Sequence, residues 1–196
     1  MIQLQPPYRP ALADDATALA ELVNMAGEGM PLYLWSGMAE SGQSPWDVGR
    51  ERAMRESGGF SYRNAVVLEH GEDVAACLIG YPLEDDPAPA DYADMPPMFV
   101  PLQQLEDLAP GTWYLNVLAT YPEHRGRGFG RGLLEVAEAI AADEGKSGLS
   151  IIVSDANAAA RRLYDRQGYI ERDKRPMVKN GWKNHGANWV LLIKEL

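Results

Sequence analysis

Arginine and glycine dominate one short run near the middle of the chain, residues 125–132, which holds four glycines and three arginines in eight positions. An extended apolar stretch (residues 113–119) precedes this run, and a helical pattern (residues 133–142) follows it. Glycines let backbone N–H groups converge on an anion, and the N-terminus of a helix favours negative charge. The run therefore predicts a phosphate-binding turn, and three arginines suit the two charges of a pyrophosphate.

Two common phosphate-binding motifs do not fit this run. A P-loop needs Gly-Lys followed by Ser or Thr, whereas two leucines follow Gly132. A dinucleotide-binding fingerprint needs the spacing G-x-G-x-x-G, but the glycines of this run alternate at every second position. A nucleotide-binding redox domain is therefore disfavoured. The spacing that does fit is R-x-x-G-x-G, with Arg125, Gly128 and Gly130.

A second pattern opens at Asn157, 32 residues after Arg125 and just beyond a strand-like stretch at residues 149–153. Asn is a favoured N-cap residue, and Gly168 suits the position just past a helix end, so a short helix is expected between them. Seven residues, about two helical turns, separate Asn157 from Tyr164, which places both side chains on one face. One of them could anchor a ligand while the other reaches its reactive end.

Together the two patterns resemble the coenzyme-A-binding elements of the GNAT N-acetyltransferases. R-x-x-G-x-G is similar to the family's cofactor loop, and residues 157–169 are similar to its second element, N-x-x-A-x-x-x-Y-x-x-x-G-[FY]. Residues 8–15 also look like the opening of many GNAT domains. The resemblance implies an α+β fold, the GNAT acyltransferase fold, whose central twisted sheet of about six to seven strands is mixed, mostly antiparallel and flanked by helices.

The resemblance also implies roles for individual residues toward acetyl-CoA. Backbone groups of Leu118 and Thr120 would pair with the pantetheine arm, and Asn157 would bind that arm from the opposite side. Tyr164 matches the family's general acid, because a phenol with a pKa of about 10 keeps a proton that it can give to the departing thiolate. The pyrophosphate would be held by loop residues, namely Arg125, Gly126, Arg127, Gly128, Gly130 and Arg131.

The implied reaction is transfer of an acetyl group from acetyl-CoA to a primary amine of a small molecule or peptide, by direct attack on the thioester. Family members often carry a general-base carboxylate nine residues before the loop arginine, and here that position is Asn116, which cannot accept a proton. A water held by Asn116 or by backbone carbonyls could act instead, as could His185, and the sequence leaves this open. The alternative function is a non-catalytic acyl-CoA-binding or sensing domain, which the presence of Tyr164 disfavours.

Composition limits the remaining classes of function. A net charge of −10 over 196 residues disfavours a nucleic-acid partner, and the length suits a single domain over residues 1–196. The single cysteine, Cys77, excludes an internal disulfide, and the three histidines lack metal-ligand spacing, so no metal is expected. Neither a membrane span nor a signal peptide is visible, so a cytoplasmic protein is expected. The expected partners are acetyl-CoA and an amine, and assembly as a homodimer stays open.

An acidic, proline-rich insertion occupies residues 84–107, between the third and fourth expected strands. It holds seven acids, five prolines and no Lys or Arg, which is typical of an irregular surface segment without a core of its own. The insertion is either a solvated loop or an acidic lip that attracts a cationic amine. In the implied fold the acceptor enters near the first two helices and the final hairpin, so the candidate lining residues are Tyr33, Trp35, Trp46, Trp182 and His185.

The remaining elements must hold these side chains in place. A first strand is expected over residues 3–9, followed by a helix that Asp14 or Asp15 caps and another that Ser44 caps and that runs to residue 55. Residues 65–69 and 74–81 should pair as a hairpin, with Cys77 buried in its second strand. Two final strands are expected over residues 169–174 and 188–194.

Overall fold

The computed structural model describes residues 2–88 and 90–196. Pro89, one of the five prolines of the acidic insertion, lies outside the described residues. The chain divides into two compact units: unit 1 comprises residues 82–115 and 137–196, and unit 2 comprises residues 2–81 and 116–136. The strand at residues 112–120 and the helix at residues 129–143 run from one unit into the other, as does the last residue of the strand at residues 73–82. Each unit is described by itself below.

Within the described ranges, seven strands form one mixed sheet in the order β1-β2-β3-β4-β5-β7-β6. The strands are β1 (Tyr8–Pro10), β2 (Ala65–His70), β3 (Asp73–Pro82), β4 (Thr112–Thr120), β5 (Gly148–Ser154), β6 (Ile170–Pro176) and β7 (Asn188–Glu195). Four neighbouring pairs are antiparallel, namely β1/β2, β2/β3, β5/β7 and β6/β7. β4 and β5 pair in parallel from Thr112↔Gly148 to Tyr114↔Ser150. This mixed, mostly antiparallel sheet confirms the expected fold class.

The first strand is shorter than the sequence indicated. Residues 3–9 were expected, but only Tyr8–Pro10 pairs with β2. Pro6 and Pro7 lack the backbone N–H that a regular ladder needs, so they lie outside β1, although the Pro7 carbonyl still accepts the Glu69 N–H at 2.9 Å. The predicted hairpin is confirmed: β2 and β3 pair from Ala65↔Ile79 to His70↔Asp73, and Cys77 in β3 is fully buried.

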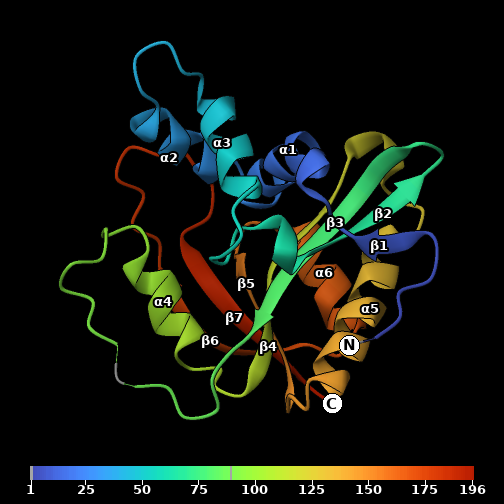
Figure 1. Ribbon diagram of the computed structural model, residues 1–196. Helices are drawn as coiled ribbons and strands as arrows, with labels where there is room; N and C mark the ends of the chain where they lie inside the picture. The colour runs from blue at the N-terminus through green and yellow to red at the C-terminus, as the bar shows by residue number, and fades with distance from the viewer. Residues whose placement is uncertain (1, 89) are drawn as a thin grey trace. The chain divides into compact units, whose positions relative to one another are not determined.

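Three helices gather in unit 2, coloured blue to cyan in Figure 1: α1 (Ala16–Ala26), α2 (Met30–Met38) and α3 (Pro45–Ala53). α3 packs against both α1 and α2. Ser44 caps α3 as predicted, because its Oγ accepts the Asp47 N–H at 3.2 Å, although the helix ends at Ala53 rather than at residue 55. The apolar face of α1 is buried in the core of unit 2, and it contains Ala16, Leu19, Ala20, Leu22 and Val23.

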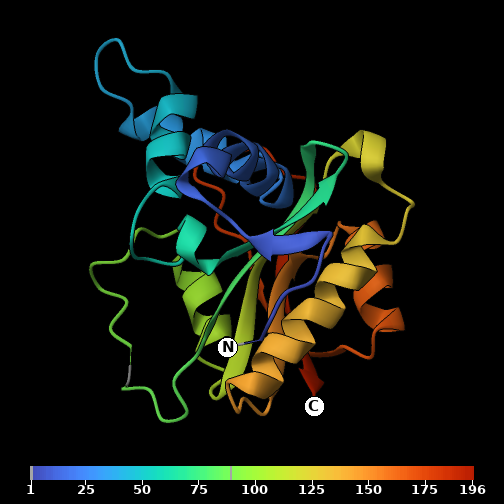
Figure 2. The same ribbon diagram turned by 45° about the vertical axis from the view of Figure 1, so that its right-hand side comes forward.

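Unit 1 contains α4 (Val100–Glu106), the second half of α5 (Phe129–Asp143) and α6 (Ala158–Arg166). α4 packs against β5, β6 and β7. Figures 1 and 2 both show α6 beside the second half of α5. Among the residues described, no helix combines the length and the apolarity that a membrane span requires.

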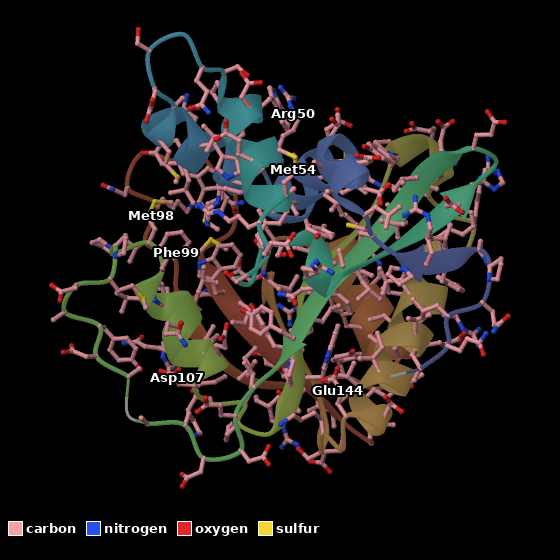
Figure 3. All side chains as sticks on the ribbon, viewed as in Figure 1. Arg50, Met54, Met98, Phe99, Asp107 and Glu144 are labelled. Carbon is pink, nitrogen blue, oxygen red and sulfur yellow. The ribbon has the colours of Figure 1, made fainter. Side chains whose placement is uncertain are left out.

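The acidic insertion is not irregular throughout as expected, because its end forms a helix that packs against the sheet. Met98, Pro101 and Leu105 are buried at helical spacing, and the segment around them forms α4. Proline is tolerated in the first turn of a helix, where its missing N–H has no partner to lose, so Pro101 does not prevent the helix. Figure 3 shows Met98 and Phe99 at one end of α4 and Asp107 at the other.

Candidate active site

The glycine run forms a turn that opens directly into α5. Gly126 and Gly128 have φ angles of +75° and +84°, a left-handed backbone conformation that favours glycine. α5 begins at Phe129, directly after Gly128 and inside the run, and not at residue 133 as the sequence indicated. The Gly132 N–H donates to the Gly128 carbonyl at 3.0 Å. The N–H groups of the intervening residues therefore precede the helical ladder, which is the arrangement that binds anions.

The three arginines of the run differ in their partners. Arg125 Nε donates to the Thr120 carbonyl at 3.2 Å, within the same turn. Arg131 Nε donates to Glu135 Oε1 at 2.9 Å, one helical turn away, so its charge is balanced by an acid. Arg127 has no acidic partner in the described part of the chain and donates instead to His70. Arg125 and Arg127 thus retain net positive charge beside the turn, and Arg131 contributes less than the sequence indicated.

The His70 ring that Arg127 contacts packs against a second histidine and a phenylalanine. The ring centroids of His70 and His124 lie 5.3 Å apart, and those of His70 and Phe129 lie 5.7 Å apart. Nδ1 of His124 is buried and has no hydrogen-bond partner among the described residues. His70 ends β2, and His124 belongs to the 3-10 helix η3 (Pro122–His124) just before the turn. The glycine run therefore rests on the β2/β3 hairpin, a contact that no motif spacing revealed.

β4 presents one open face just before the turn. Val117 and Ala119 are buried, whereas Asn116, Leu118 and Thr120 are partly exposed, the alternation of a half-buried strand. The structure thus places the expected general-base position and the two expected pantetheine-pairing residues along one face of one strand, in unit 2. A carboxylate is absent from the Asn116 position, as the sequence shows.

The last glycine of the run has a packing role. A Cβ at Gly132 would overlap the hydroxyl oxygen of Tyr8, which lies in β1. Gly132 is therefore explained by the close approach of β1 to α5, without any ligand. The glycines that the turn itself requires are Gly126 and Gly128.

The helix predicted between Asn157 and Gly168 is confirmed in unit 1. Asn157 is the N-cap of α6, and its Oδ1 accepts the Ala160 N–H at 3.1 Å. Gly168 follows the helix with a φ of +86°, as a C′ glycine should. Because the Asn157 oxygen already serves as the cap, its side-chain NH₂ is the group that remains to donate to a ligand.

Tyr164 lies on α6 with only 4% of its surface exposed. Burial raises its pKa above the ordinary value of 10, because an apolar environment disfavours the charged phenolate. Its ring packs against that of Tyr169, with centroids 5.6 Å apart and planes tilted by 56°. Tyr164 is therefore a phenol that keeps its proton at neutral pH, which a general acid requires.

The candidate acceptor residues divide into packed and exposed ones. Trp35 is 3% exposed and belongs to the core of unit 2, against Phe60 and Trp46 at centroid distances of 6.0 and 6.1 Å. Trp182 is buried in unit 1, stacked on Trp189 at 5.9 Å. Both tryptophans therefore serve packing. The exposed candidates are Tyr33 in α2 and His185 in the loop between β6 and β7.

The loop that carries His185 is tied to the end of β5. Asp155 follows β5 directly, and its carboxylate accepts the Ala187 N–H at 2.8 Å, the Asn188 N–H at 3.0 Å and the Asn188 side-chain amide at 2.9 Å. Asp155 lies only two residues before Asn157. One carboxylate thus connects the start of α6 to the loop before β7, and the sequence gave no motif for this connection.

Two further acids form side-chain pairs that connect separate elements. Asp85 of the acidic insertion pairs with Lys146 at 2.9 Å, and Lys146 also donates to the Leu83 carbonyl. In unit 2, the Tyr121 hydroxyl donates to Glu21 at 2.6 Å, which connects the residue after β4 to α1. Asp85 and Glu21 therefore hold elements together. In the described ranges, no group of three or more His, Cys, Asp or Glu side chains could hold a metal ion.

The sequence matches the model of the acetyltransferase (GNAT) family over residues 32–169. The chain belongs to the GNAT acetyltransferase family. The matched span contains the glycine run, Asn157 and Tyr164, and acetyl-CoA as co-substrate agrees with this membership. No curated protein matches the sequence.

Solved structures share the GNAT fold over nearly the whole chain. One is described as an acetyltransferase, with 24% identity, a TM-score of 0.65, and 96% of this chain and 98% of that one covered. An N-acetyltransferase from Staphylococcus aureus Mu50 has 19% identity and a TM-score of 0.65, with 95% and 99% covered. The NatC complex bound to Gag peptide and CoA contains a chain with 14% identity and a TM-score of 0.54, with 96% and 97% covered.

Proposed function

We propose that this GNAT protein transfers the acetyl group of acetyl-CoA to a primary amine of a small molecule or peptide. The observation that carries the proposal is the turn at Gly126 and Gly128, which opens α5 with backbone N–H groups outside the helical ladder. Such a turn can hold a diphosphate, and two arginines beside it supply the opposite charge. Acetyl-CoA carries this diphosphate together with a reactive thioester.

Individual residues receive roles in this proposal. Arg125, Arg127 and the backbone of the turn bind the pyrophosphate, and the β4 backbone at Leu118 and Thr120 pairs with the pantetheine arm. The side-chain NH₂ of Asn157 donates to the same arm, because its oxygen already caps α6. Arg131 has a smaller role, since Glu135 balances its charge.

The chemistry needs one bond to form and one to break. The neutral amine nitrogen bonds to the thioester carbonyl carbon, and the carbon–sulfur bond then breaks. Tyr164 gives its phenolic proton to the departing thiolate, so coenzyme A leaves as a thiol. The proton that the amine loses passes to a water at Asn116 or to His185, and it restores Tyr164 through solvent. The sum is one amide and one thiol, with no proton gained or lost.

Binding and turnover test the proposal separately. Calorimetric titration should give saturable acetyl-CoA binding that weakens by about tenfold or more in Arg125→Ala, since hydrogen bonds to charged groups contribute about 1.5–3 kcal/mol each. Arg63→Ala is the matched control, because Arg63 forms an exposed pair with Glu56 away from the turn. Free thiol release over a panel of primary amines should then report turnover. Absence of binding would refute the proposal, and binding without turnover of any amine would support an acyl-CoA-binding domain.

A further inference from the structure

Arg52, near the end of α3, carries a positive charge that has no partner in the folded protein. Within residues 2–88 and 90–196, no hydrogen bond, ion pair or cation–π contact involves its guanidinium group. Three other arginines of these ranges also lack a partner, namely Arg55, Arg162 and Arg166, but all three are exposed, so water can solvate them. Arg52 is partly buried instead, and a charge that leaves water without a counter-ion costs free energy.

The position of Arg52 on α3 explains its burial. Val48 and Gly49 are buried residues of this helix, and they lie four and three positions before Arg52. Residues at these spacings share one helix face, so Arg52 lies on the face that packs against the protein. Val48 belongs to the same core of unit 2 as Val117 and Ala119 of β4, the strand that is expected to pair with the pantetheine arm.

The nearest charge makes the position of Arg52 less favourable still. Partial burial lowers the pKa of Arg52, and the positive charge of Arg55 lowers it further. No carboxylate of the described residues counters these two effects. An arginine nevertheless keeps its proton at neutral pH, so the unliganded protein holds a permanent, uncompensated charge on this face.

The helix dipole accounts for only part of this arrangement. The C-terminus of a helix favours a positive charge in its last turn. Arg50 lies in the same last turn as Arg52, and it pairs with the Asp47 carboxylate. The dipole thus explains a cation at this end of α3, but not a second guanidinium group on the packed face without a carboxylate. An anion from outside the chain would supply what is missing.

We infer that Arg52, with Arg55 nearby, binds the carboxylate of the acceptor, which is therefore an amine that also carries a carboxylate, such as an α-amino acid. This inference rests on the proposed function, in which an amine accepts the acetyl group. A guanidinium group holds a carboxylate through two parallel, charge-assisted hydrogen bonds. The amine nitrogen remains free to attack the thioester, because the acceptor is held by its other end.

The packing of α3 agrees with this assignment. The acceptor is expected near the first two helices, and α3 packs against both α1 and α2, beside which it lies in Figure 1. The coenzyme-A turn at Gly126 and Gly128 has its own arginines, so the phosphates do not require Arg52. The anion that Arg52 binds is thus assigned to the acceptor and not to acetyl-CoA.

Acceptors that differ only in the carboxylate test the inference. Thiol release should be measured for each common α-amino acid and for its α-amide, which keeps the amine and the side chain. For the preferred acceptor, the parent should have a kcat/KM about tenfold or more higher with the acid than with the amide. An aminoalkyl phosphate in the same panel shows whether the arginine takes a phosphate instead, and a preference for it would overturn the carboxylate assignment.

Arg52→Met removes the charge and keeps most of the side-chain volume. It should raise the KM for the acid about 10–100-fold and leave both the KM for the amide and the Kd of acetyl-CoA unchanged. Arg52→Lys should recover only part of the loss, because a lysine keeps the charge but not the two parallel hydrogen bonds. Arg166→Met is the matched control, since Arg166 also lacks a partner among the described residues but is exposed, and all its constants should equal those of the parent.

Stability provides a second readout. Arg52→Met should leave the melting temperature unchanged or raise it, because no partner within the chain is lost. An equal rise in KM for acid and amide, or a weaker acetyl-CoA affinity, would overturn the inference. An active parent that does not distinguish acids from amides would overturn the inference alone, even if Arg52→Met does not fold. A parent without turnover of any amine would overturn the proposed function, and the inference with it.

Discussion

Arg127 donates a hydrogen bond from Nη1 to Nε2 of His70 over 3.1 Å. A guanidinium group has no acceptor, so Nε2 of His70 must be unprotonated in this pair. The two residues are 57 positions apart in the sequence, and the bond connects the glycine run to the end of β2. His70 therefore restricts the directions that the Arg127 side chain can take before any ligand arrives.

This restriction predicts a graded effect of substitutions at His70 on acetyl-CoA binding. His70→Ala should raise the Kd about 3–10-fold, because a hydrogen bond of ordinary strength no longer holds Arg127. His70→Gln should retain most of the affinity, since its side-chain oxygen can accept at a similar reach. Titration calorimetry measures both. The prediction is wrong if His70→Ala has the same effect in an Arg127→Ala background as in the parent.

Replacement of the proposed general acid should affect turnover and leave binding intact. Tyr164→Phe removes the proton that the thiolate needs and keeps the buried ring, so kcat should fall about 10²–10⁴-fold with little change in acetyl-CoA affinity. Steady-state thiol release and calorimetry check the two quantities. Turnover within a few-fold of the parent would mean that solvent or another group protonates the thiolate.

The acidic insertion provides a test of electrostatic steering. Asp86, Asp91 and Asp94 are exposed, whereas Asp85 pairs with Lys146 and should be left intact. Changing the three exposed residues to Asn should lower kcat/KM for a cationic amine and flatten its dependence on salt, because screening acts over about 10 Å at 0.1 M. A neutral amine serves as the control. If the variant and the parent have the same kcat/KM for each amine at low salt, the insertion does not attract the substrate and is only a solvated surface segment.

A fall in pH should reduce the stability of unit 2, because it protonates Asp15 in its ion pair with Arg9. Arg9 Nη1 and Nη2 donate to the two Asp15 oxygens at 2.7 and 3.0 Å. Burial tends to raise the pKa of Asp15, but hydrogen bonds from Arg9 and from the Leu12 N–H outweigh it and hold that pKa below its ordinary value. The stabilisation is therefore complete above the unfolded-state pKa of about 3.9 and is lost as pH falls through the lower folded-state pKa.

Asp15→Asn tests this linkage. At pH 7 it should reduce the free energy of unfolding by about 1.5–3 kcal/mol, the range for hydrogen bonds to charged groups. The difference from the parent should shrink as pH falls below about 4, where the parent also loses the charge. Urea unfolding at several pH values provides the measurement. If the difference in unfolding free energy between Asp15→Asn and the parent does not change with pH, the Asp15 charge is not the source of the stabilisation.

The sequence predicted the elements whose local chemistry is strong. The turn before α5, the cap and stop of α6, the Ser44 cap and the β2/β3 hairpin all follow from glycine, proline and capping residues at short range. α4 was missed because its acidic, proline-rich flanks outweighed three buried residues, Met98, Pro101 and Leu105, that only tertiary packing reveals. Trp35 and Trp182 were candidates for an acceptor surface and are buried in the structure, because an aromatic residue in a sequence looks the same whether it lines a site or fills a core.

Hydrogen bonds between side chains far apart in the sequence could not be predicted, for a different reason. His70 lies at the end of a hairpin, where any polar residue would be compatible with the sequence pattern. Its hydrogen bond with Arg127 is visible only in the folded structure. Arg52 is likewise only one of several charges in a helical stretch of the sequence. Lack of a partner is a property of the folded state, so no spacing rule can encode it.

The Asp155 carboxylate has a consequence for how this protein could diversify. It fastens the end of the loop before β7 through two backbone N–H groups, at Ala187 and Asn188, so this anchorage is largely independent of which side chains the loop carries. Residues 178–185 could thus change in composition over generations while the loop keeps the same point of attachment. Under the proposed function, in which His185 lies near the acceptor, substitutions in this loop would alter acceptor preference while the attachment to Asp155 stays in place.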